Sequence, residues 1–179
     1  MRALIASLAL VLAACGQTNT AAPEVEPAAE TAEAPAAAAP QGEPMSTGLM
    51  GGMSTTASGD VAALTINADA LAFTNADGEQ TFSAPTEFLG IVAPSTLIAA
   101  GGETFAAAAP SSTATRVELR RLTSAAPERL CGGMAATHVA IVYAEPLTGL
   151  QLMVFTGADA PDPNARDSAV CAIYAYAVD

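Results

Sequence analysis

The sequence contains neither tryptophan nor lysine, and its only histidine is His138. Arginine therefore supplies all side-chain positive charge: six Lys+Arg residues stand against 18 Asp+Glu residues, and the formal net charge is −12. Nucleic-acid binding requires a basic surface that displaces counterions from phosphates. The charge balance therefore predicts no nucleic-acid partner, and it disfavours attraction to anionic lipid headgroups.

Residues for acid–base, nucleophilic or metal chemistry are also scarce. A catalytic triad or dyad would have to use His138, and no serine lies in a Gly-x-Ser-x-Gly elbow. His138 lies on the face of a predicted strand opposite Val139, Ile141 and Tyr143, and we expect an exposed or hydrogen-bonded side chain rather than a general base. With one histidine and no Cys-x-x-Cys pair, a zinc site lacks ligands. The sequence predicts a protein that is not an enzyme and that uses no cofactor.

The first 14 residues have the pattern of a signal peptide. Met1 and Arg2 give a short positive region, and residues 3–14 are a run of twelve residues that are all apolar except Ser7. As a helix this run is about 18 Å long, well short of the roughly 30 Å of a bilayer core. The segment therefore fits a cleaved signal peptide better than a membrane-spanning helix.

Leu12-Ala13-Ala14-Cys15 resembles the lipobox of bacterial lipoproteins. The resemblance implies cleavage before Cys15, a diacylglyceryl group on its thiol and a further acyl chain, such as palmitate, on its amine. Two or more acyl chains hold a protein firmly on a membrane. Gly16 stands where an Asp would resemble an inner-membrane retention signal, so we expect a cell-envelope protein on the outer membrane, facing the periplasm. The alternative is a plain secreted protein in which Cys15 is incidental.

Residues 15–59 have the composition of a disordered tether. Residues 20–44 are rich in Pro, Ala and Glu, and residues 45–59 are rich in Gly, Ser and Thr, so neither part has enough to bury to offset the entropy of ordering. Met45, Met50 and Met53 also lie here. Met50-Gly-Gly-Met53 is similar to the Met-x-x-Met spacing of periplasmic copper binders, and thioethers suit Cu(I). We favour a solvated spacer and keep copper binding as an alternative.

Residues 60–179 form the predicted folded domain, which we expect to be mainly β, or α+β with one short helix at residues 103–109. Residues 75–78 read Asn-Ala-Asp-Gly, a turn signal, and residues 116–122 read as an edge-type strand with a charged face. Successive β-rich runs predict a small antiparallel meander. The predicted strands are residues 61–67, 70–74, 79–83, 88–92, 116–122, 137–143, 150–156 and 170–178.

If the lipobox uses Cys15, the two other cysteines, Cys131 and Cys171, form an even pair in an exported protein. A disulfide between them would close a loop of about 41 residues, for which chain entropy predicts roughly 4 kcal/mol of stabilisation. A metal or redox pair is the alternative, and we favour the structural disulfide.

Two groups of charged residues are candidate sites. Asp159, Asp162 and Asp167 could ligate Ca²⁺, but the EF-hand spacing is missing, and a solvated loop is the preferred interpretation. The arginines could receive an acidic ligand, or they could pair with Glu118 and Glu128 at the surface. These arginines are Arg116, Arg120, Arg121 and Arg129.

Together these features predict a lipid-anchored envelope lipoprotein whose acidic β-rich domain is a non-enzymatic binding or structural module. A membrane contact through the N-terminal lipid and a basic protein or envelope component are the expected partners. One subtype would resemble the lysozyme inhibitors, some of which are small acidic lipoproteins with one disulfide. An envelope hydrolase and a copper-binding protein are less favoured hypotheses.

Overall fold

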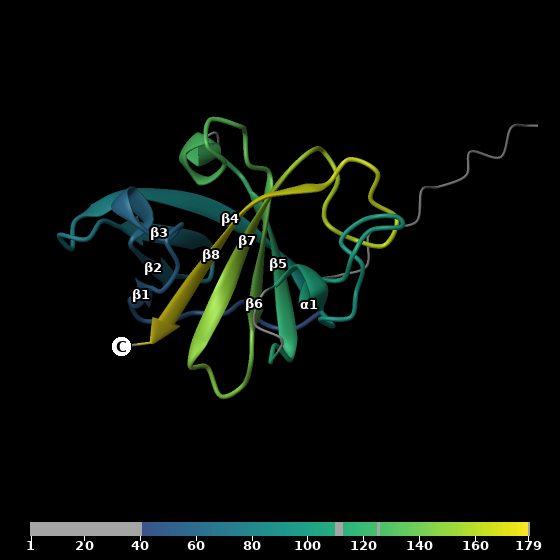
Figure 1. The fold of residues 1–179 in the computed structure, drawn as a ribbon, viewed down its shortest axis with the longest axis horizontal. Coiled ribbons are helices and arrows are strands. Elements are labelled where there is room, and N and C mark those ends of the chain that lie inside the picture. The colour runs from purple at the N-terminus through teal and green to yellow at the C-terminus, as the bar shows by residue number, and fades with distance from the viewer. Residues whose placement is uncertain (1–40, 110–112, 125, 179) are drawn as a thin grey trace, which may run out of the picture. The chain divides into compact units, whose positions relative to one another are not determined.

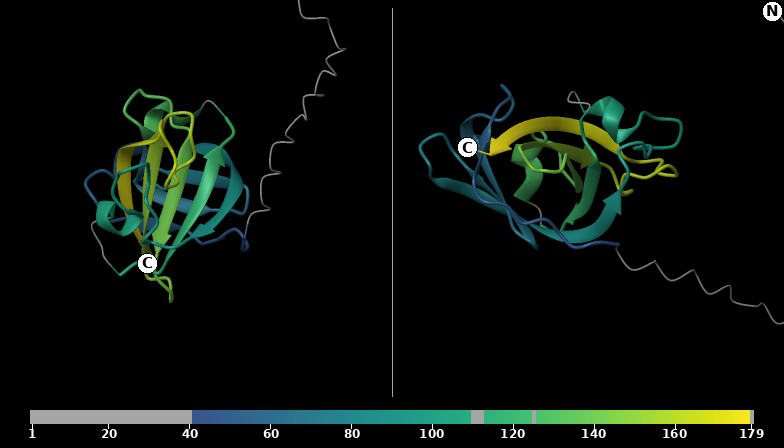
Figure 2. Two further views of the ribbon diagram at one scale, coloured as in Figure 1. Left: turned by 90° about the vertical axis from the view of Figure 1, so that its right-hand side faces the viewer. Right: turned by 90° about the horizontal axis from the view of Figure 1, so that it is seen from below.

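The computed structural model describes residues 41–109, 113–124 and 126–178, and their main feature is a closed antiparallel β-barrel. Each strand pairs with the strands before and after it in the sequence, and β8 pairs with β1 to close the barrel (Figures 1 and 2). The strands are β1 (Met50–Gly52), β2 (Ala63–Ile66), β3 (Ala70–Thr74), β4 (Gln80–Val92), β5 (Arg116–Leu122), β6 (His138–Tyr143), β7 (Gly149–Thr156) and β8 (Ala169–Val178).

The mainly β fold and the antiparallel meander are confirmed, but the prediction for residues 116–122 is wrong. This segment, β5, is not an edge strand, because it pairs with β4 on one side and β6 on the other. Its charged residues made it look like an edge. One of its two faces instead points into the barrel, where Glu118 and Arg120 lie fully buried.

β4 joins two halves of the barrel. The sequence predicts two separate strands here, at residues 79–83 and 88–92, but the structure has one strand of 13 residues. Its first half pairs with β3 and its second half with β5. The register shifts between Phe88 and Gly90, and Gly90 has a φ of 137°, a conformation that favours glycine. This irregularity allows β4 to pair with β3 in one half of the barrel and with β5 in the other.

Side chains alternate between the interior and the outer face of the barrel. The interior is filled by a cluster of apolar and aromatic residues. A second cluster lies outside, where α1 (Phe105–Ala108) and the connection between β4 and β5 cover β6 and β7. Thr104 caps α1 by accepting a hydrogen bond from the Ala107 amide, and Phe105 packs edge-on against Phe155 at 6.3 Å. The short helix predicted at residues 103–109 is thereby confirmed.

Two short 3₁₀ helices, η1 (Gly59–Val61) and η2 (Ala126–Leu130), close one opening of the barrel. Leu130 is fully buried in the interior cluster, together with Val61. The predicted disulfide is confirmed: Cys131, directly after η2, is bonded to Cys171 in β8. This end of the barrel is therefore apolar and covalently fixed.

The folded domain starts earlier than residue 60. Residues 41–59, predicted to belong to the tether, contain β1 and a segment that runs along the lower side of the barrel in Figure 1. Their Gly- and Ser-rich composition is typical of a tether, but β1 closes the barrel by pairing with β2 and β8. Residues 1–40, with the predicted signal peptide and Cys15, lie outside the described residues. Among the described residues, no helix is long and apolar enough to span a bilayer.

Candidate functional site

The interior of the barrel is occupied by the protein itself. Arg120 is fully buried, and its Nε lies 2.5 Å from Oε1 of Glu118, which is also fully buried. The guanidinium donates further hydrogen bonds to the carbonyl oxygens of Asn67 and Met45 and to the Thr86 hydroxyl. This pairing satisfies charges that would be costly to bury alone. The pair and the apolar cluster occupy the interior of the barrel, so the outer surface is the place available to a ligand.

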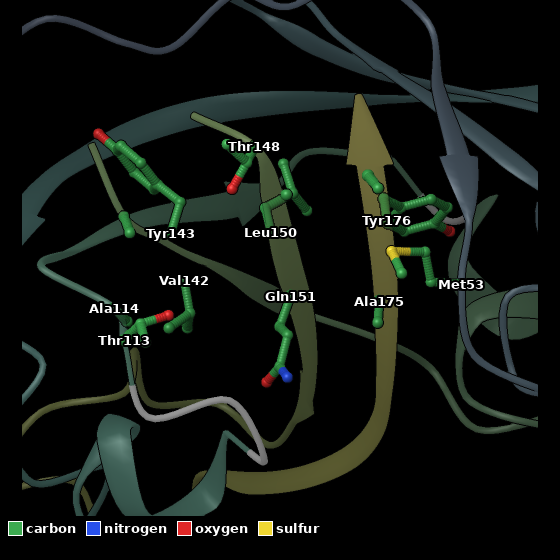
Figure 3. Close-up of a pocket in the computed structure, with 13 residues that line it drawn as sticks. Met53, Thr113, Ala114, Val142, Tyr143, Thr148, Leu150, Gln151, Ala175 and Tyr176 are labelled. Atoms are coloured by element: carbon green, nitrogen blue, oxygen red, sulfur yellow. The ribbon is translucent and has the colours of Figure 1, made fainter. Parts of the chain in front are cut away.

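A pocket of about 550 Å³ lies on the outer face of β6, β7 and β8. Val142, Gln151 and Ala175 come from three adjacent strands and form its floor. Thr113 and Ala114, just before β5, line one side, and Met53, just after β1, lines the other (Figure 3). We call this pocket the outer groove.

The shape of the outer groove follows from the alternation of large and small residues in β8. Tyr174 and Tyr176 point into the barrel, whereas Ala175 and Ala177 face the groove. Gly149 brings β7 close to β8: a Cβ built there would lie 2.8 Å from the carbonyl oxygen of Tyr176. Small side chains on these two strands leave the hollow open.

The lining of the outer groove is chemically neutral. None of its 13 lining residues, all in the described part of the chain, is charged, and none is His or Cys. Its outward-facing oxygen-bearing side chains are those of threonine and glutamine, whereas Tyr143 and Tyr176 belong to the interior cluster. Burial raises the pKa of Tyr143 and Tyr176 above the usual tyrosine value, so neither phenol is poised to lose its proton. The arrangement suits binding better than acid–base chemistry.

His138 does not belong to the outer groove. It begins β6 and is only 3% exposed, while its Nδ1 lies 3.0 Å from the Thr137 hydroxyl. Val139, Ile141 and Tyr143 belong to the interior cluster, as the alternation predicts. Burial lowers the pKa of His138, the positive charge of Arg121 lowers it further, and Asp159 partly opposes both. A buried, neutral histidine held by a threonine fits a structural role.

The four candidate arginines do not form one anion site. Three of them form exposed ion pairs across strands or loops: Arg116 with Glu145, Arg121 with Glu87, and Arg129 with Asp60. Two predicted pairings need correction. Arg129 pairs with Asp60 rather than Glu128, and the Arg120–Glu118 pair is buried inside the barrel rather than exposed.

The acidic loop between β7 and β8 uses its carboxylates to hold its own backbone. Asp159 accepts hydrogen bonds from the amides of Arg166 and Asp167, which lower its pKa. The Asp167 carboxylate accepts a hydrogen bond from the Ala158 amide, and the Asp162 carboxylate accepts one from the Asn164 amide. Among the described residues, no group of three or more His, Cys, Asp or Glu side chains is arranged to hold a metal ion.

The three methionines of the copper hypothesis do not share one face of the barrel wall. Met50 points into the barrel and is 1% exposed, whereas Met53 lines the outer groove and is 72% exposed. Met45 is partly buried against the interior cluster. The structure therefore does not bring the three thioethers together.

Comparisons with protein-family models, with curated proteins and with solved structures return no match for this chain. The candidate site therefore rests on the chain's own geometry. Sequence reasoning missed both the outer groove and the buried ion pair. The signals were present: the alternation in 174–177 places alanines and tyrosines on opposite faces, and the i, i+2 spacing places Glu118 and Arg120 on one face.

Proposed function

We propose that the chain is a lipid-anchored cell-envelope lipoprotein whose acidic barrel acts as a non-enzymatic binding or structural module. The lipobox resemblance at Leu12–Cys15 supports the anchor. The contents of the barrel support the role as a module. Apolar side chains and the Glu118–Arg120 pair occupy the interior, so a partner would bind the outer surface. The anchor and the module are independent parts of the proposal.

One observation carries the binding role: an uncharged groove on the outside of an otherwise acidic protein. Protein-binding surfaces are typically depleted of charge at their centre and polar at their rim. Met53, at the edge of the groove, adds a flexible exposed thioether of the kind that adapts to a partner's surface. The absence of charged, His and Cys side chains among the described lining residues favours binding over turnover.

A basic protein is a second candidate partner. The net charge of −12 would steer a basic protein towards the barrel. Three of the barrel's arginines are paired with surface carboxylates, so these three do not present unpaired positive charge to such a partner. A lysozyme is one such basic protein, and the lysozyme-inhibitor-like hypothesis belongs to this candidate.

A capture experiment with the full-length chain tests the proposal. The immobilised chain, with its disulfide intact, is offered envelope extract and a panel of lysozymes at low and at high salt. A partner that stays bound at high salt and is lost on Ala175→Gln, which fills the outer groove, supports binding there. A basic partner released by salt, with Ala175→Gln unaffected, supports the electrostatic candidate. If nothing is retained at either salt concentration, the binding role is contradicted and a structural role remains.

A further inference from the structure

The two openings of the barrel are closed by different chemistry. At the opening under η1 and η2, Leu130 and Val61 are buried apolar plugs, and the Cys131–Cys171 disulfide fixes the plug to β8. On the lower side in Figure 1, the extended segment 41–48 crosses instead. This segment is bonded to β4 through Gln41 and Ile91 and to β2 through Thr47 and Ile66.

The middle of this segment lies on the buried ion pair. The Met45 amide donates to Oε2 of Glu118 at 2.8 Å, and Nη2 of Arg120 donates to the Met45 carbonyl oxygen, also at 2.8 Å. In the barrel, β2 and β5 are separated by β3 and β4. A segment that contacts both β2 and β5 therefore spans the distance between two strands that are not neighbours. Both polar groups of one residue are thus held by two charged side chains.

We infer that residues 41–52 form a detachable latch, which leaves and rejoins the barrel while β2–β8 stay folded. Most of the latch buries little: Gln41, Gly42, Glu43 and Leu49 are exposed, and only Met50 is fully buried. The strand that closes the barrel is also short: β1 has three residues, of which two pair with β2 and all three pair with β8. Segments with few buried apolar contacts open at a lower free energy than the core.

The ion pair makes release of the latch easier. When an apolar plug such as Leu130 leaves, apolar surface is exposed to water, which is unfavourable. When the latch leaves, water reaches Glu118 and Arg120, and hydration of two charges offsets part of the lost hydrogen bonding. The opposite end lacks this compensation, and its disulfide also restricts movement. The latch side is therefore the end that opens.

The latch is adjacent in sequence to the predicted tether, since residues 1–40 immediately precede Gln41. If the lipid anchor of the proposed function holds, traction from the membrane reaches the Gln41–Ile91 bond first and the Met45 contacts next, before the strands β2–β8. The inference about the latch itself does not depend on the anchor. It is therefore tested on a full-length chain carrying Cys15→Ser, which removes the proposed lipidation site.

Native-state hydrogen exchange tests the latch. The latch amides of Met45, Thr47 and Gly52 are all hydrogen bonded, to Glu118, Ile66 and Ala62 respectively. We expect them to exchange about 100-fold faster than the β6 and β7 amides, but well below the rate of an unstructured chain. Equal rates in the latch and in β6–β7 would overturn the inference, and so would latch amides as fast as an unstructured chain.

A matched pair of variants separates the latch from general destabilisation. Thr47→Val removes the hydroxyl that accepts the Ile66 amide, and Thr123→Val removes a hydroxyl bonded to the Pro85 carbonyl, away from the latch. We expect Thr47→Val to accelerate latch exchange about tenfold without changing β6–β7, and Thr123→Val to leave the latch unchanged. Equal acceleration of both regions by Thr47→Val would show one cooperative unit and contradict the latch.

Discussion

The hydroxyl of Tyr174 donates a hydrogen bond of 2.7 Å to the backbone carbonyl oxygen of Leu130 inside the barrel. The two residues are 44 positions apart, and the bond joins β8 to the plug formed by η2. Cys131 and Cys171, each close in sequence to one partner, are joined by the disulfide. Tyr176 makes the equivalent bond to the carbonyl oxygen of Val61, the last residue of η1. The apolar end of the barrel is therefore held by two tyrosines and one covalent bond.

Replacing both cysteines, Cys131→Ala with Cys171→Ala, should lower the free energy of unfolding by about 2–4 kcal/mol. The open chain gains entropy when the 40-residue link is lost. Urea unfolding of the variant and of the parent chain, with and without reductant, measures the difference. The reductant should destabilise the parent alone. Equal stability of the two chains under oxidising conditions would contradict a structural role for the disulfide.

Arg120→Met should destabilise the barrel by about 3–5 kcal/mol, because Glu118 would remain buried without its partner. Replacing both charges, with Glu118→Leu and Arg120→Met, should cost less than the single change. The comparison is made by chemical unfolding of the two variants and of Arg121→Met, which removes an exposed ion pair and should change stability by about 1 kcal/mol or less. A double variant less stable than Arg120→Met would show that the unpaired Glu118 charge is not the main cost.

The stability of the barrel should fall as the pH falls below about 6.5, the ordinary pKa of histidine. Burial and Arg121 lower the pKa of His138 in the folded state, so the unfolded chain takes up a proton first. His138→Gln should remove this part of the pH dependence. Asp159 stays ionised in this range because backbone amides lower its pKa. Urea midpoints between about pH 7.5 and 5 test the prediction, and parallel curves for the two chains would refute it.

Cys15→Ser should abolish lipid attachment if the lipobox resemblance is functional. In a bacterial host fed a labelled fatty acid, the parent chain should carry the label and fractionate with membranes. The variant should lose both properties, whereas the Cys131→Ala, Cys171→Ala chain should keep them. Label on the Cys15→Ser chain, or none on the parent chain, would show that Cys15 is not the anchor.

The β-rich architecture could be predicted because its strands alternate or carry β-branched residues, and because turn residues mark their ends. Asn75, for example, accepts hydrogen bonds from the Asp77 and Glu79 amides in the predicted turn. Closure could not be predicted, because β1 is a three-residue Met-Gly-Gly strand whose pairing is set by tertiary contacts. The continuity of β4, the longest strand, could not be predicted either, because Pro85 lies within it and proline disfavours the interior of a strand.

The candidate site was less predictable than the fold. The charged residues in 116–122 suggested an exposed strand. Arg120 is instead buried, because it bonds to the carbonyl oxygens of Met45 and Asn67, which are distant in the sequence and could not be identified from it. The outer groove combines residues from five separate parts of the chain, from Met53 to Ala177. Such a site depends on the barrel register, and local sequence patterns contain little of that information.

Site-specific photocrosslinking on the full-length chain tests the binding role most directly. A photoreactive residue replaces either Met53, at the edge of the outer groove, or Met134, a similarly exposed methionine in the loop before β6. We predict a defined crosslinked partner from position 53, lost on Ala175→Gln, and none from position 134. Equal crosslinking from both positions, or crosslinking at 53 that survives Ala175→Gln, would contradict a partner seated in the outer groove.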